Sequence, residues 1–200
     1  MAALGLWGMI APDIYGGAGA DAVSYALALM EIAAADGALS TIVSIQNSIT
    51  AANASSISDG AAALLMTRKS VADRLGLPVI ARVVATAAHA QEPAAFTTAP
   101  VPAMRKVLQK ADWAVDDVDL FEVNEAFAVV AMIAAKDLGI PAEKLNVNGG
   151  ATALGHPIGA SGARILTTLL GALQHRGLKR GVASLCIGGG EATAMAIELI

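Results

Sequence analysis

The stretch SGARILTTLLGALQHRGLKRGVASLCIGGGEATAMAIELI, residues 161–200, decides the fold class. Its first half repeats apolar residues at helical spacing, and Gly177 stands where such a helix would end. The predicted buried stripe of this helix consists of Ile165, Leu166, Leu169, Leu170 and Leu173. Two apolar runs follow, with the three glycines of 188–190 between them. The stretch therefore predicts one helix and then two strands joined by a glycine-rich turn.

Strands and helices also alternate upstream of this stretch, from about residue 52. Runs rich in β-branched or small apolar residues predict strands at 60–67, 78–90, 117–124 and 144–150. Amphipathic spacing and end signals predict helices at 69–76, 100–111 and 125–139. Alternation closed by a hairpin predicts an α/β fold with a mixed sheet covered by helices.

The first 49 residues have a different character. They contain four acidic residues and no Lys or Arg, so the whole formal net charge of −4 falls in this segment. Helical spacing over 21–36, followed by an uncharged apolar stretch over 37–49, favours a helical hairpin. We therefore predict two domains, 1–49 and 50–200, with the boundary near Ile49 and Thr50.

Composition excludes several classes of protein. Cys186 is the single cysteine, so a disulfide framework within the chain and a cysteine-based zinc site are excluded. The acidic balance and the lack of a basic cluster argue against a nucleic-acid partner. The longest apolar run, 126–135, is too short to cross a membrane, and no basic signal region precedes the first apolar stretch. We expect a soluble cytoplasmic protein.

Three polar constellations lie at predicted strand ends or in loops, where the sites of α/β proteins gather. They are Asn124 with Glu125, then His156 in a glycine-rich loop, and finally Cys186 before its glycines. Each has an alternative structural interpretation: a hydrogen-bonded loop histidine, or a cysteine that packs as a small apolar residue. The loop 149–162 also suggests phosphate binding, but its glycine spacing fits neither known phosphate-binding fingerprint.

Together, these residues favour acyl transfer. His and Cys exchange protons near neutral pH, and an imidazole beside a thiol can activate it as a nucleophile. The glycines after Cys186 let backbone N–H groups approach an oxyanion, and one such donor is worth about 3 kcal/mol of barrier lowering. Asn124 could position a water or accept a hydrogen bond from the histidine. From chemistry alone, Cys186 is the predicted nucleophile.

Four motifs then resemble the C-terminal half of thiolases, the acyl-CoA acyltransferases that condense or cleave 3-oxoacyl-CoA thioesters. The resemblance covers about residues 50–200 and includes the motifs NASSISDGAAALLM, NEAFA, NVNGGATALGHPIGASGARI and LCIGGGEA. It implies a thiolase-like C-terminal domain, an enzyme of the acyl-CoA C-acyltransferase class, a CoA thioester as substrate and a role in fatty-acid β-oxidation.

The resemblance reassigns the predicted site residues. His156 would activate a nucleophilic cysteine in the family's other, N-terminal domain. Cys186 becomes the acid/base that carries the proton of the incoming or leaving group. Asn124 would hold a water that forms one oxyanion hole with His156, and Gly188 would supply a backbone N–H to the other.

Three further residues are implied to contact CoA. Ser55 and Phe127 would line the path of the pantetheine arm, and Ile158 is placed with them as a CoA-binding residue. Ser56 and Ser58 stand where thiolases more often carry Gly and Asn, which affects only the fine contacts with CoA.

The thiolase N-terminal half, which holds the nucleophile and grips most of CoA, has no counterpart in the sequence. Residues 5–48 instead resemble part of the N-terminal helical domain of acyl-CoA dehydrogenases. That fragment lacks the regions implied to bind most of the flavin and to carry the catalytic glutamate. We therefore expect no FAD, no other cofactor and no metal. The chain thus resembles a fusion of two pieces of β-oxidation enzymes.

Three functional hypotheses follow. The first is a thiolase-type acyltransferase that supplies only the His/Cys/Asn half of the site. The second is a catalytically incomplete fusion that binds CoA at most, and that self-associates or forms a homo-oligomer because apolar surface is left uncovered. The third, a flavin dehydrogenase, depends on the first segment alone.

Overall fold

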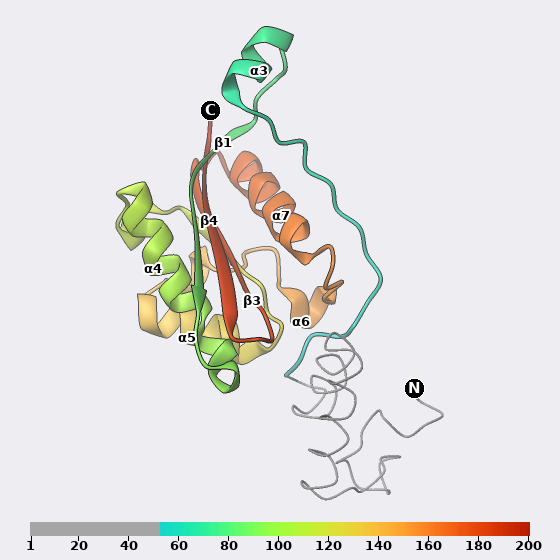
Figure 1. Cartoon of the computed structure of the whole chain (residues 1–200), viewed down its shortest axis with the longest axis vertical. Coiled ribbons are helices and arrows are strands. Elements are labelled where there is room, and N and C mark those ends of the chain that lie inside the picture. The colour runs from blue at the N-terminus through green and yellow to red at the C-terminus, as the bar shows by residue number, and fades with distance from the viewer. Residues whose placement is uncertain (1–52) are drawn as a thin grey trace, which may run out of the picture. The chain divides into compact units, whose positions relative to one another are not determined.

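The computed structural model describes residues 53–200, and Ser55–Ile200 form one compact unit (Figure 1). The helical segment predicted for 1–49 lies outside the described residues. No helix within the described part of the chain is both long and apolar enough to cross a membrane.

A four-stranded mixed sheet forms the centre of this unit, as predicted. The strand order is β1-β4-β3-β2. β2 and β3 run parallel, whereas β4 pairs antiparallel with both β3 and β1. The strands are β1 (Ala81–Ala90), β2 (Leu120–Val123), β3 (Arg180–Cys186) and β4 (Glu191–Leu199). The last two form the hairpin that the C-terminal stretch predicts.

Helices cover both faces of the sheet (Figure 1). α4 (Pro100–Ala111) and α5 (Ala128–Leu138) lie on one side, and α7 (Ser161–Arg176) lies on the other. Two proline residues begin α4, and left-handed glycines end α5 and α7 at Gly139 and Gly177. The shorter elements are α3 (Lys69–Leu75), α6 (Ala151–Leu154) and three 3₁₀ turns at Pro93–Thr98, Val115–Asp117 and Ala142–Lys144.

The predicted stripe of α7 is confirmed. Ile165, Leu169 and Leu173 are buried against the sheet in one cluster with Leu120, Ala183 and Ile197, while Leu166 and Leu170 are partly buried beside it. Gly181 of β3 permits this close approach, because a Cβ there would lie 2.9 Å from the Leu169 side chain. Burial of each large aliphatic side chain contributes about 1.5–3 kcal/mol.

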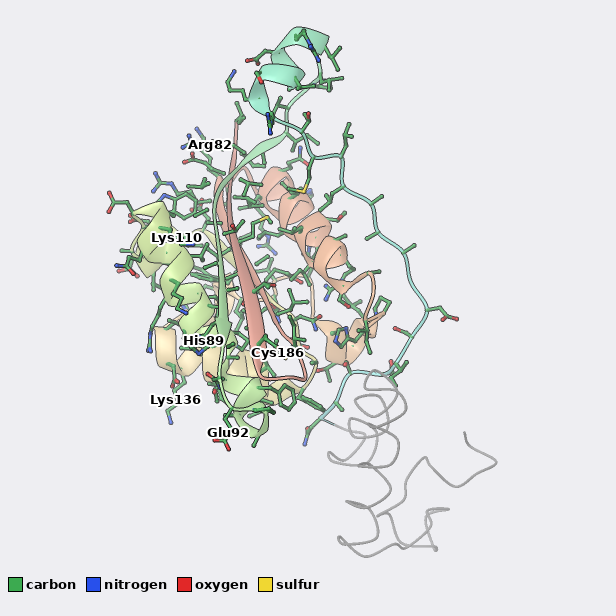
Figure 2. The ribbon with its side chains drawn as sticks, in the orientation of Figure 1. Arg82, His89, Glu92, Lys110, Lys136 and Cys186 are labelled. Atoms are coloured by element: carbon green, nitrogen blue, oxygen red, sulfur yellow. The ribbon has the colours of Figure 1, made fainter. Side chains whose placement is uncertain are left out.

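The outer edge of β1 is partly occupied by lysines of α4. Lys110, labelled in Figure 2, donates from Nζ to the carbonyl of Thr86 at 2.9 Å. Lys106 Nζ donates to the carbonyl of Ala88 at 3.3 Å. Lysines placed on an edge strand discourage pairing with another chain. This edge therefore presents fewer free acceptors than an uncovered strand would.

Two of the predicted strands are wrong. Residues 60–67 form no strand, and Leu65 and Met66 are 89 % and 59 % exposed. An isolated strand leaves its N–H and C=O groups unpaired, and no strand of the described residues lies beside it to pair with. Residues 144–150 make a single bridge, Leu145 to Phe121, because Asn146 adopts a positive φ of 46° that turns the chain away.

Candidate active site

The ends of two parallel strands create the site. β2 and β3 pair side by side, so their carboxyl ends meet at the same edge of the sheet. Asn124 follows β2 directly, and its N–H donates to Ser184 O of β3 at 2.9 Å. Cys186 is the last residue of β3, two residues beyond that contact (Figure 2). The topology therefore places two residues that are 62 positions apart in the printed sequence at the same edge of the sheet.

His156 reaches this edge from the loop after α6. Gly155 adopts a φ of 89°, a left-handed region that favours glycine, and the loop is tied down because His156 N–H donates to Ser56 O at 2.9 Å. The ring Nε2 lies 3.4 Å from Asn124 Nδ2, and Nδ1 lies 2.6 Å from Ser161 Oγ. The loop thus places the imidazole beside Asn124, as the acyl-transfer interpretation requires.

The surroundings of His156 favour its neutral form. Burial lowers the pKa of His156 below its ordinary value, and the positive charge of Arg164 lowers it further. A neutral imidazole has a free lone pair at neutral pH and can accept a proton. The electrostatics therefore suit a general base.

The surroundings of Cys186 also favour the neutral form of its side chain, which for a thiol means a raised pKa. The residue is 7 % exposed, and burial raises the pKa of its thiol to about 11. The thiolate is the nucleophilic form of cysteine, and at neutral pH a thiol with this pKa is almost entirely protonated. These properties suit an acid/base better than the nucleophile predicted from chemistry alone.

The glycine-rich turn after Cys186 has a fixed shape. Ile187 N–H donates to Glu191 O at 2.8 Å, and Gly190 N–H donates to Ile187 O at 3.1 Å. Gly190 has a φ of 101°, and a Cβ there would collide with the carbonyl of Gln91. Gly188 is exposed in this turn, and its N–H donates to no described residue. Its amide is therefore open to an external acceptor.

The three predicted CoA contacts differ in accessibility. Ser55 is buried, and both its N–H and its Oγ–H donate to Ala126 O, at 3.1 and 3.0 Å. Phe127 is also buried and packs edge-to-face on Phe96, with the ring centroids 5.8 Å apart. Ile158 is 47 % exposed. Of the three, Ile158 alone presents a large part of its side chain to solvent.

Sequence reasoning missed a buried ion pair beneath the site. Arg164 of α7 contacts Glu122 of β2 at 3.1 Å, with side chains 18 % and 3 % exposed. Burial raises the pKa of Glu122 to about 7, although Arg164 acts to lower it. The signal in the sequence was a lone carboxylate within the apolar strand LFEV, a position that a charged residue occupies only when it is paired.

A second polar network holds the loop that precedes His156. Glu125 accepts hydrogen bonds from Asn146 Nδ2 at 2.8 Å and from Thr152 N–H at 3.2 Å. Asn146 Oδ1 also accepts from Val123 N–H at 2.8 Å. These contacts tie the end of β2 to the start of α6. Glu125 of the NEAF motif therefore supports the site's shape.

Comparison with known proteins identifies the families that the chain resembles. Residues 77–199 match the family model described as "Thiolase, C-terminal domain", and residues 1–58 match "Acyl-CoA dehydrogenase, N-terminal domain". The acetyl-CoA acetyltransferase of Allochromatium vinosum is 52 % identical over 162 residues, which cover 81 % of this chain and 41 % of that protein. The cytosolic acetyl-CoA acetyltransferase of Mus musculus is 51 % identical over 150 residues, which cover 75 % and 38 %.

A solved structure supports the fold assignment. The crystal structure of the Bacillus anthracis acetyl-CoA acetyltransferase superposes with a TM-score of 0.74 at 45 % sequence identity. The match covers 76 % of this chain and 39 % of that one. The chain thus spans about two fifths of the length of the relatives it matches.

Proposed function

Because the chain belongs to the thiolase family through residues 77–199, we propose that it supplies one half of an active site for acyl transfer between CoA thioesters. The observation that carries this proposal is the meeting of Asn124 and His156 at the sheet edge where β3 ends in Cys186. The reaction would be 3-oxoacyl-CoA cleavage or acetyl-CoA condensation.

Each of the three residues is suited to one step. The neutral imidazole of His156 would remove the proton of a nucleophilic thiol, which then attacks the thioester or keto carbonyl. In the cleavage direction, the carbon–carbon bond breaks and Cys186 gives its proton to the departing carbanion. The Cys186 thiolate then recovers a proton from the incoming CoA thiol, which attacks the acyl-enzyme.

Two sets of donors would stabilise the oxyanions. A water held by Asn124 and His156 would serve one, and the open N–H of Gly188 would serve the other. Removing one such donor typically costs about 3–4 kcal/mol of transition-state stabilisation. The exposed Ile158 is the proposed apolar contact for the substrate's CoA arm, with Ser55 and Phe127 supporting that path from beneath.

The nucleophile would come from outside residues 1–200. Cys186 is the single cysteine of the sequence, and its pKa of about 11 disfavours that role. We propose that a chain carrying the remaining part of the family's sequence covers the sheet edge that holds Asn124 and His156 and supplies the nucleophile. Support comes from a hollow of about 540 Å³ on the sheet beside α7, lined mostly by small and apolar residues such as Ala88, Leu166 and Met195, together with Lys110.

The alternative is a non-catalytic protein that binds CoA at most and self-associates. Large apolar side chains are exposed in the described part of the chain, among them Leu65, Met66 and Met132. Such surface favours association. We place either form in the cytoplasm, since two mammalian relatives are named cytosolic. Neither form uses a flavin or a metal in this proposal.

A single-turnover assay separates the two functions. The purified chain is mixed with radiolabelled acetyl-CoA, alone and together with the separately produced N-terminal half of a thiolase whose own C-terminal half is removed. The proposal predicts no acyl-enzyme from the chain alone and labelled cysteine on the added half in the mixture. His156→Ala should abolish that labelling. Labelling absent from the mixture, despite a stable complex by sizing, would favour the non-catalytic alternative.

A further inference from the structure

Arg164 holds a fixed position beneath the site. It lies in the first turn of α7 and reaches the end of β2, where its Nη1–H donates to Glu122 Oε1 at 3.1 Å. Its Nη2–H donates to Asn124 Oδ1, also at 3.1 Å. A planar guanidinium held by a buried carboxylate has little rotational freedom. Arg164 therefore presents a donor to Asn124 from a constant direction.

This contact decides which way the Asn124 amide faces. A guanidinium carries donors only, so the atom of Asn124 that faces it must be the amide oxygen. The amide nitrogen consequently points toward His156 and lies 3.4 Å from Nε2, a long contact. Because an NH₂ group also donates only, the ring nitrogen that faces it must offer a lone pair.

The other side of the imidazole imposes the same arrangement. Ser161 Oγ lies 3.1 Å from the carbonyl of Pro157, which only accepts, so the hydroxyl donates its proton there. The lone pairs of that hydroxyl then accept from His156 Nδ1–H at 2.6 Å. Both neighbours of the ring place its proton on Nδ1.

We propose that Arg164 is a positioning residue that fixes the orientation of the Asn124 amide and thereby keeps the lone pair of neutral His156 on Nε2. Without the guanidinium, the amide can turn by half a rotation and offer its oxygen to Nε2. An oxygen there would accept from an Nε2–H, which favours the other tautomer and the imidazolium. This role rests on the proposed function in one respect: a base that faces a substrate at Nε2 needs that lone pair.

The test is the protonation state of the His156 ring in the full chain. Long-range ¹H–¹⁵N spectra of ¹⁵N-labelled protein distinguish a protonated from an unprotonated ring nitrogen, and H156Q identifies the signals among the three histidines. The expected result is one neutral tautomer, with the proton on Nδ1. In R164M, the Nε2–H form should gain population and the titration midpoint of His156 should move upward.

Two variants separate orientation from charge and from general damage. R164K keeps the positive charge but replaces the fork that reaches Glu122 and Asn124 with a single ammonium on a shorter side chain. An ammonium that pairs with Glu122 and no longer reaches Asn124 should hold the midpoint low while the single tautomer is lost. R176M makes the same change as R164M at the exposed end of α7 and should leave both readouts unchanged. If R164M unfolds because Glu122 is left unpaired, E122Q/R164M removes that charge too.

Two results would overturn the proposal. One is a wild-type protein whose neutral His156 carries its proton on Nε2, a result that requires no variant of Arg164. The other is a folded R164M, or E122Q/R164M, in which the tautomer stays single and unchanged. These spectra require no turnover, so a failed acyl-transfer assay refutes the proposed function without deciding whether Arg164 positions the Asn124 amide. Altered tautomers likewise say nothing about acyl transfer.

Discussion

The reactivity of Cys186 offers the most direct test of how the site divides its roles. The perturbation is alkylation of the folded chain with iodoacetamide as the pH is raised. Only the thiolate reacts at an appreciable rate, so the rate reports the ionised fraction. Burial raises the pKa of this thiol from 9.0 to about 11. Since Cys186 is the single cysteine, all incorporated label reports on it.

The expected magnitude follows from the shift. At pH 8, a thiol with a pKa of about 11 is ionised in roughly one molecule in a thousand, against roughly one in ten for a pKa of 9.0. Alkylation of the folded chain should therefore be about 100-fold slower than that of the unfolded chain from ionisation alone. The 7 % exposure of the residue slows it further.

The assay follows label incorporation by mass spectrometry from pH 7 to pH 10, in buffer and in urea that unfolds the chain. C186S controls for modification at other residues. The folded chain should show a rate that still rises tenfold per pH unit at pH 10, whereas the unfolded chain should level off. A rate that levels off below pH 9 in the folded chain would refute the reasoning, and it would make Cys186 a candidate nucleophile.

Three further predictions concern stability and cofactor content. The pKa of Glu122 rises from 4.5 to about 7 on folding, so the folded state binds the Glu122 proton more tightly than the unfolded state does. The free energy of unfolding should therefore fall as the pH rises from 4.5 to 7, by at most about 3 kcal/mol. Urea unfolding at several pH values should show this fall, and E122Q should remove it. Gly190→Ala should lower the melting temperature, since a Cβ there meets the Gln91 carbonyl, whereas Gly171→Ala, with open space around it in α7, should not. The purified chain should show no flavin absorbance; a bound flavin would contradict the cofactor prediction.

Sequence reasoning predicted most of the fold because the relevant signals are local. Helices α4 and α7 begin and end close to where proline, glycine and apolar spacing placed them. The wrong strand at 60–67 has the composition of a buried strand, but composition does not supply a neighbour to pair with. Pairing is a property of tertiary structure, so local pattern alone cannot establish it.

The same distinction applies to the site. Asn124, His156 and Cys186 were predicted as site residues because loop and strand-end positions carry chemistry in α/β folds. Arg164 and Glu122 were missed because each looks like a single charge on an otherwise apolar element, and their contact joins positions 42 apart in sequence. The guanidinium of Arg164 contacts Glu122 and Asn124 at the same time, and sequence spacing does not specify such a contact.

The electrostatics of the site argue for incompleteness more strongly than the count of cysteines does. An acyl-accepting thiol needs a lowered pKa, yet burial raises the pKa of Cys186, and only a backbone hydrogen bond opposes that rise. Ionising the thiol with its raised pKa costs about 3 kcal/mol more than ionising it at the ordinary value of 9.0. His156 is meanwhile kept neutral, ready to accept a proton. In the proposed function, His156 is the base and Cys186 the acid, and acyl transfer requires a second thiol that reaches His156 from outside residues 1–200.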